Sequence, residues 1–179
     1  MDNKYSIIPA SSGAFLFLWG FGLFIAIIFL VTLIESDYHA ASIAVTSVIS
    51  LGLIGLFVSF GYQARHVSFT LTVQGLRIGP GLYGRTIPWE KIDIGGVRVI
   101  NLDIEKEYQP MWRMNGAGLP GYSAGWFKLR NKEKALLFVT DRSRIIYIPT
   151  TEKYSVLLSV RDAEEFAGAL RKWKQPGGK

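Results

Sequence analysis

The residue types that carry most enzyme chemistry are scarce in this chain, which has no cysteine and only two histidines, His39 and His66. Disulfides, thiolate metal sites and a cysteine nucleophile are therefore excluded, and a histidine metal site or proton relay has almost nothing to draw on. Gly79-Pro80-Gly81 resembles a phosphate loop only superficially, because it lacks the lysine and the following helix. No carboxylate pair or serine beside a base stands out, so we predict a protein that is not an enzyme and binds no cofactor and no metal.

Positive charge is the main chemical feature of the chain beyond residue 60. From residue 61 onward, 19 Lys and Arg stand against 11 Asp and Glu, a net charge of +8. Such an excess favours an anionic neighbour, and because an apolar segment precedes it we favour a membrane surface over nucleic acid. The candidate membrane-surface residues are Arg65, Arg77 and Arg85. The turn at Gln74-Gly75 lacks the basic cluster that an inositide headgroup needs, so no inositide specificity is predicted.

The segment 102–125 is a candidate partner-binding loop. It lacks a strand period, is longer than the roughly 12 to 15 residues of an ordinary loop, and combines methionines and aromatic residues with four glycines. Such loops are often binding elements, because aromatic side chains supply contact area and glycines allow close approach of the backbone. A compatible alternative is that the loop only closes the mouth of a barrel. The candidate residues are Met111, Trp112, Arg113, Met114, Pro120, Tyr122 and Trp126.

These side chains must be positioned by two very different parts of the chain. Residues 13–34 and 41–60 are two uncharged, mainly apolar runs of 22 and 20 residues. About 20 apolar residues suffice for a transmembrane helix, so we expect two antiparallel spans joined by the loop 35–40. A cleaved signal peptide is the alternative for the first run, but that run is too long and only Lys4 precedes it.

The flanks of the two runs predict an orientation. The connecting loop has no lysine or arginine, whereas Lys4 precedes the first run and Arg65 and Arg77 follow the second. Basic flanks favour the cytoplasmic side, which predicts a multi-pass protein of the inner (cytoplasmic) membrane with both termini in the cytoplasm. Neither run has an ionisable residue, so the hairpin is expected to anchor the chain and not to transport ions or protons.

Beyond residue 66 the hydrophobic period changes to two, as in half-buried strands. Phe69, Leu71 and Val73 alternate with polar residues, and similar short runs follow between turns. Strands are predicted at 68–73, 76–78, 85–89, 96–101, 126–130, 135–140, 144–148 and 154–158. Apolar residues then recur at helical spacing from Val160 to Trp173, before Pro176 and the following glycines end the helix. An antiparallel sandwich or small barrel with one helix follows from this pattern.

Three motifs stand out within residues 67–173. They are Leu71-Thr72-Val73-Gln74-Gly75-Leu76-Arg77-Ile78, Ile87-Pro88-Trp89 with Ile92, and Gly118-Leu119-Pro120-Gly121-Tyr122 followed by Gly125-Trp126-Phe127. Through these motifs the segment resembles the bacterial pleckstrin-homology-like (PH-like) domains that follow two transmembrane helices. The resemblance implies about seven antiparallel strands in a partly open barrel, capped by a C-terminal α-helix, with no catalytic role attached to the fold.

The fold class expected is therefore a membrane helical hairpin followed by a mainly-β PH-like domain. We predict a non-enzymatic, membrane-anchored binding or scaffold protein that docks a protein or peptide, or another copy of itself, at the cytoplasmic face. The alternatives are a module that binds anionic lipid and an auxiliary subunit of a membrane transport or enzyme complex. The predicted organisation is an N-terminal cytoplasmic tail at 1–12, helices at 13–34 and 41–60 around an external loop at 35–40, a linker at 61–66, the PH-like domain at 67–174 and a C-terminal tail at 175–179.

Overall fold

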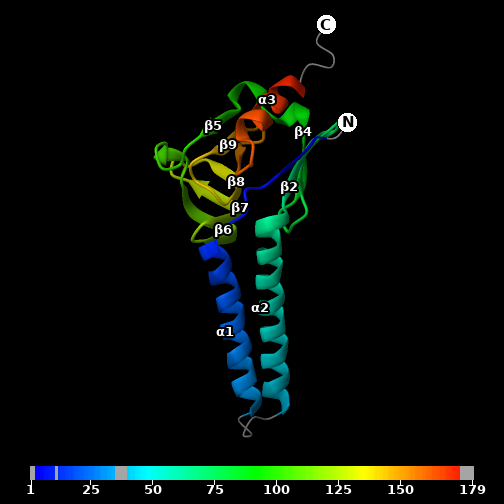
Figure 1. Cartoon of the computed structure of the whole chain (residues 1–179), viewed down its shortest axis with the longest axis vertical. Coiled ribbons are helices and arrows are strands. Elements are labelled where there is room, and N and C mark those ends of the chain that lie inside the picture. The colour runs from blue at the N-terminus through cyan, green and yellow to red at the C-terminus, as the bar shows by residue number, and fades with distance from the viewer. Residues whose placement is uncertain (1–2, 11, 35–39, 174–179) are drawn as a thin grey trace.

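A hairpin of two long helices forms one end of the molecule and a β domain forms the other (Figure 1). The computed structural model describes the backbone of residues 3–10, 12–34 and 40–173, and their side chains except at positions 3, 12, 14, 15, 18, 33, 40–42, 60 and 63–65. The predicted C-terminal tail 175–179, most of the predicted external loop 35–40 and the side chain of Arg65 lie outside the described residues.

The hairpin consists of α1 (Ser12–Ile34) and α2 (Ala40–His66), which run side by side away from the β domain (Figure 1). The rings of Phe21 and Phe57 lie 5.1 Å apart between the two helices. Crossing a bilayer needs about 20 predominantly apolar residues in one helix. Within the residues that the structure describes, no helix is both long and apolar enough to do so, and the predicted transmembrane spans 13–34 and 41–60 are not supported.

The first sheet is a four-stranded antiparallel meander in the order β1-β2-β3-β4. Its strands are β1 (Asn3–Ser6), β2 (Ser68–Thr72), β3 (Gly75–Gly79) and β4 (Arg85–Pro88). The alternation predicted for 68–73 is confirmed over β2, where Phe69 and Leu71 are fully buried. Val73 lies instead in the turn after β2 and is 83% exposed, so its predicted place on the buried face is wrong.

Strand β1 was not predicted, because its residues lie within the segment expected to be an N-terminal tail. It pairs with β2, although some 60 residues separate the two in sequence. Ile7, just after β1, is buried; its backbone N–H donates to Val67 O at 3.1 Å, and that of Ile8 donates to Ser159 O at 3.0 Å. The chain before the hairpin is thus part of the β domain. It contacts both the residue before β2 and the residue after Leu158, where the second sheet ends.

The second sheet has six strands in the order β5-β9-β10-β8-β7-β6. They are β5 (Arg98–Ile100), β6 (Pro110–Leu119), β7 (Tyr122–Leu129), β8 (Lys134–Val139), β9 (Ile145–Pro149) and β10 (Tyr154–Leu158). Strand β10 lies between β8 and β9, and it runs parallel to β8. The expectation of an entirely antiparallel fold is therefore wrong at this pair.

The segment 102–125 is not the long loop that the sequence predicted. It contains a short 3-10 helix, Lys106–Tyr108, then all of β6 and the first part of β7, which form a hairpin at Pro120 and Gly121. Gly121 has a φ of +73°, which suits a turn with proline followed by glycine. The partner-binding candidates therefore lie on β6 and β7, except Pro120, which lies in the turn between them.

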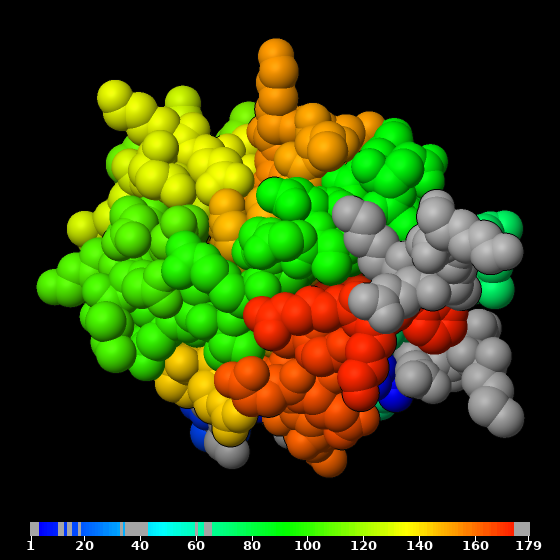
Figure 2. Space-filling model, turned by 90° about the horizontal axis from the view of Figure 1, so that it is seen from above, coloured from blue at the N-terminus to red at the C-terminus, as the bar shows by residue number. Residues whose placement is uncertain are grey.

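The C-terminal helix α3 (Ala163–Trp173) packs on the domain through Phe166, Ala167 and Leu170, all buried. This confirms the predicted amphipathic helix. Figure 2 shows α3, in orange to red, at the end of the domain opposite the hairpin, beside the green segment that contains two 3-10 helices, Trp89–Lys91 and Ile94–Gly96. Arg171 Nη2 donates to Val97 O at 2.7 Å and the rings of Trp89 and Trp173 stack with their centres 5.8 Å apart, so α3 is held against the segment of the 3-10 helices.

Candidate functional site

The first candidate surface is the outer edge of the six-stranded sheet, where β6 pairs with β7 and with no other described strand. Met111, Trp112 and Met114 have 57%, 70% and 54% of their surfaces exposed there, and Arg113 between them is exposed too. Proteins usually protect a sheet edge with charges, proline or a short strand, so large exposed apolar side chains on a ten-residue edge strand make it a candidate interaction surface. We call residues 111–114 the β6 edge patch.

Two irregularities in the register of β6 against β7 involve the two exposed methionines. Pro110 pairs with Leu129 and Trp112 with Lys128, so Met111 is an extra residue between them. Met114 is extra in the same way between Arg113 and Asn115. Such bulges bend the strand and re-aim the side chain of the additional residue. Both methionines therefore fall outside the regular alternation of β6 and remain at the surface.

A hollow of about 400 Å³ adjoins the β6 edge patch. Apolar and cationic groups both border it, because Met111 and Phe127 contribute hydrocarbon and aromatic surface while Arg113 contributes a charge. On β7, exposed Lys128 opposite Trp112 adds a second charge beside the patch. The lining residues are Pro110, Met111, Arg113, Gly118, Ser123 and Phe127.

The other predicted members of the partner-binding set do not belong to this surface. Tyr122 is 2% exposed and lies in the core, where burial raises the pKa of its phenol well above the ordinary value. Its hydroxyl has no hydrogen-bond partner among the described residues. Trp126 is half-buried, with Arg85 Cζ 4.7 Å and Lys134 Nζ 4.3 Å from its ring centre, and Pro120 is exposed in the hairpin turn.

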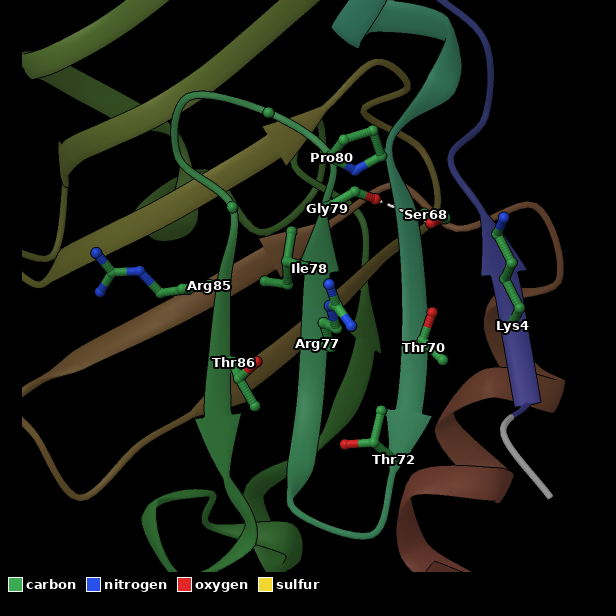
Figure 3. Close-up of a pocket in the computed structure, with 12 residues that line it drawn as sticks. Lys4, Ser68, Thr70, Thr72, Arg77, Ile78, Gly79, Pro80, Arg85 and Thr86 are labelled. Atoms are coloured by element: carbon green, nitrogen blue, oxygen red, sulfur yellow. Dashed lines mark hydrogen bonds between the residues drawn. The ribbon is translucent and has the colours of Figure 1, made fainter.

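The second candidate surface is a hollow of about 560 Å³ over the outer face of the four-stranded sheet, shown in Figure 3. We call it the basic hollow, because its charged residues are all cationic: Lys4, Arg77 and Arg85. Arg77 and Arg85 are two of the predicted membrane-surface residues. The full lining is Lys4, Ser68, Thr70, Thr72, Arg77, Ile78, Gly79, Pro80, Gly81, Gly84, Arg85 and Thr86.

Strand register sets the order of groups across the basic hollow. Lys4 on β1 is the register partner of Thr70, and Thr70 is the partner of Arg77 on β3. Arg77 in turn faces Thr86 on β4. One row across four strands therefore reads lysine, threonine, arginine, threonine, and Figure 3 shows Thr70 and Thr86 on either side of Arg77. Arg85 points away from this row, toward Trp126.

The side chains of this row make few polar contacts with the rest of the described structure. Within the described part of the chain, no carboxylate forms an ion pair with Lys4, Arg77 or Arg85, and no hydrogen bond is made by the hydroxyls of Thr70 and Thr86. The hydroxyls of Ser68 and Thr72 differ, since they donate to Gly79 O at 2.9 Å and to Gly75 O at 2.8 Å.

Sequence reasoning missed Lys4, Thr70 and Thr86 as members of a site. Lys4 and Arg77 are 73 positions apart, and only the pairing of β1 with β2 brings them to one face. The available signal was the alternation itself, because Thr70 lies between Phe69 and Leu71, both of which are buried.

The remaining ionisable clusters belong to the framework of the domain. Arg98 donates from Nη1 to Glu105 Oε2 and from Nη2 to Tyr108 OH, both at 2.7 Å. Burial and the nearby carboxylate of Glu133 raise the pKa of Tyr147 to about 12. Among the described residues, no three His, Cys, Asp or Glu side chains are grouped so as to hold a metal ion. The expected absence of a cofactor stays a prediction.

Comparison with known families gives one finding and two negative results. The family model described as "Bacterial PH domain" matches residues 67–173, more than half of the chain. The match covers the β domain from Val67 to the end of α3. No curated protein and no solved structure matches the chain significantly. With more than half of its length matched, the chain belongs to the bacterial PH domain family.

Proposed function

We propose that this protein is a non-enzymatic binding module held at the cytoplasmic membrane, and that its PH-like domain docks a segment of a protein partner on the β6 edge patch. A PH-like domain suggests a binding or scaffold role. The observation that carries the proposal is the exposure of Met111, Trp112 and Met114 on a strand whose outer edge pairs with no other described strand. The absence of a catalytic set in the sequence supports a role without chemistry of its own.

The residue types of the patch suit a binding hot spot. Tryptophan and arginine are enriched among the residues that dominate binding energy, and Trp112 and Arg113 are adjacent. Methionine is flexible and polarisable, so the two methionines adapt to the shape of an apolar partner. The neighbouring hollow of about 400 Å³ is large enough to receive one or two side chains of that partner.

Charge around the patch points to the chemistry of the partner. Arg113 lies within it, and exposed Lys128 and Arg130 lie on and just after β7. A second copy of the chain would bring these cations against their own equivalents, whereas an acidic segment would complement them. The partner that fits best is therefore a protein segment that carries apolar and acidic residues, and the role as an auxiliary subunit is one form of this proposal.

Attachment to the membrane is the second part of the proposal. The two hairpin helices α1 and α2 expose large apolar side chains along their length, such as Leu16 at 71%, Ile34 at 72% and Val48 at 72%. An apolar surface of this extent needs an apolar neighbour, and acyl chains supply one. The basic flanks of the hairpin favour the cytoplasmic face for both termini and for the domain.

Site-specific photo-crosslinking in native membranes tests the docking surface. A crosslinking residue is placed at Trp112 of the full chain and, in a matched variant, at Val73, which is an apolar residue that is 83% exposed on the turn after β2. We expect one protein to be captured at position 112 and not at 73. Arg113→Glu should abolish the capture, whereas Arg144→Glu, the same change at an exposed residue outside the patch, should retain it.

The outcomes separate the alternatives. A crosslinked peptide rich in apolar and acidic residues, which then binds the purified chain, supports the proposal. Capture of a second copy of the chain would show that the patch serves self-association and not a different partner. Capture of lipid at position 112 would assign the patch to the membrane surface. Equal capture at positions 73 and 112, or none at either, contradicts docking at this patch.

A further inference from the structure

The basic hollow on the outer face of the four-stranded sheet lies apart from the β6 edge patch, and its residues belong to other strands. Its volume of about 560 Å³ is the larger of the two surface hollows described above. Every charged residue that lines it is a cation, and most of the others are small or hydroxylated. The ligand that it could bind therefore carries negative charge and accepts hydrogen bonds.

Arg77 is central to the row of groups across the sheet. Thr70 and Thr86 are its register partners on the two sides, and neighbouring strands lie about 4.8 Å apart, so both hydroxyls are within reach of an anion placed over the guanidinium. Lys4 is one strand farther, about 10 Å from Arg77 across the strands, and it lines the same hollow, so its charge acts on an anion there. An anion over Arg77 would thus have hydrogen-bond donors from β2, β3 and β4 beside it and the charge of Lys4 on β1 nearby.

The number and kind of these donors favour a phosphoryl group. The arginine fork donates two parallel hydrogen bonds to a pair of phosphoryl oxygens, and lysine acts on such a group as a point charge. Two further hydroxyls suit the additional oxygens that a tetrahedral phosphoryl group has and a planar carboxylate lacks. Binding need not break an ion pair first, because the described structure gives Arg77 and Lys4 no carboxylate partner.

We infer that the basic hollow binds a phosphoryl oxyanion, with Arg77 as the main ligand and Lys4, Thr70 and Thr86 around it. Two sources supply this chemistry, the headgroup of an anionic phospholipid and a free phosphate compound. A lipid source is sterically reasonable, because Ser68 at one end of the hollow lies two residues after the end of α2 at His66. The site does not depend on partner docking at β6.

Nuclear magnetic resonance of the full chain in non-ionic detergent micelles tests the site. The threonine methyl groups of Thr70 and Thr86 and the side-chain Nε–H of Arg77 are followed during titration with inorganic phosphate and, separately, with phosphatidylglycerol added to the micelles. Sodium chloride at equal ionic strength is the reference titration. We expect saturable shifts at these three residues with one or both phosphoryl compounds and none of that size with chloride.

Two kinds of variant make the test specific. Arg77→Gln should weaken the binding at least about fivefold, the loss expected for one charge-assisted hydrogen-bonding group. Arg144→Gln removes the same charge from an exposed position outside the hollow and should leave the affinity within twofold. Thr70→Val and Thr86→Val keep the branched shape of the side chain and remove only the hydroxyl, so they test the site even if Arg77→Gln fails to fold.

The titrations also identify the source of the ligand. Saturation by phosphatidylglycerol alone assigns the site to a lipid headgroup, and saturation by inorganic phosphate assigns it to a free phosphate compound; both results support the inference. Shifts that do not saturate, or that Arg77→Gln and Arg144→Gln weaken equally, overturn it, because they indicate charge attraction without a site.

Discussion

Gly116 and Gly125 are register partners in the β6–β7 pair, and they bring the two backbones closer than a side chain would permit. A Cβ atom on Gly116 would lie 2.3 Å from Ala124 O, and one on Gly125 would lie 2.5 Å from Asn115 O. Their φ angles of +154° and +112° add backbone strain for any other residue. These two glycines therefore permit the close pairing of β6 and β7 in the hairpin that contains the β6 edge patch.

Gly116→Ala is expected to lower the free energy of unfolding by at least about 2 kcal/mol, because the backbone must move to relieve the contact. Gly168→Ala is the matched control. That glycine lies inside α3, and a Cβ atom there would meet no atom within 4 Å. The same chemical change should raise the free energy of unfolding by roughly 0.5–1 kcal/mol. Denaturant unfolding of both variants measures the difference, and an equal effect at both positions would refute the argument.

Tyr147 makes the stability of the domain depend on pH in the alkaline range. Its pKa is raised to about 12 in the folded protein, first by burial and then by Glu133, against an unfolded value near 10. The folded state therefore holds the phenolic proton more tightly, so this contribution to stability is complete below pH 10 and is lost as the pH rises through 10 toward 12. Tyr147→Phe should make the fall in unfolding free energy between pH 9 and pH 11 shallower, as measured by urea denaturation at each pH.

At the level of the elements, the sequence predicted best where a strand is buried throughout or alternates regularly. The fully buried strand β10 lies where it was expected, at Tyr154–Leu158, and β2 follows its period-two pattern through Thr72. Strand β6 was missed because residues 111–115 are all exposed and two bulges interrupt its register, so no inward and outward alternation exists to be read. The same bulges expose the residues that were predicted to bind a partner.

The candidate sites were predictable to different extents. The segment Met111–Met114 was recognisable from residue type alone, since large apolar residues beside an arginine outside any apparent core suggest a contact surface. Tyr122 was misassigned, because its burial depends on packing between distant elements. The basic hollow required the strand register, which brings Lys4 from before the hairpin to β2, and no local pattern contains that information.

Substitution of Ile7 tests whether the segment of β1 is part of the domain. It is 1% exposed, and it bridges the start of β2 and the end of the second sheet. Ile7→Ala should lower the free energy of unfolding by roughly 2–4 kcal/mol, as expected for a truncated core side chain. Val73→Ala, at an exposed position, should change it by less than about 0.5 kcal/mol. A negligible effect of Ile7→Ala would place the N-terminal segment outside the cooperative unit.

For the whole molecule, the placement of the domain relative to the membrane is open to a direct measurement, because the chain has no cysteine of its own. A single cysteine replaces Lys172, an exposed residue near the end of α3. A maleimide that cannot cross membranes should label it in inside-out vesicles and not in sealed spheroplasts, since the domain is proposed to face the cytoplasm. Labelling in spheroplasts at the same rate would reverse the proposed orientation.

The hairpin is inserted between two strands, β1 and β2, that are hydrogen-bonded neighbours. Five residues connect β1 to α1, and Val67 alone connects α2 to β2. A domain on one flexible linker sweeps out a volume that grows with the linker, and the effective concentration of a ligand on the same membrane falls accordingly. Two short connections remove that freedom, so the distance of each candidate binding surface from the hairpin is set by the fold and not by chain entropy.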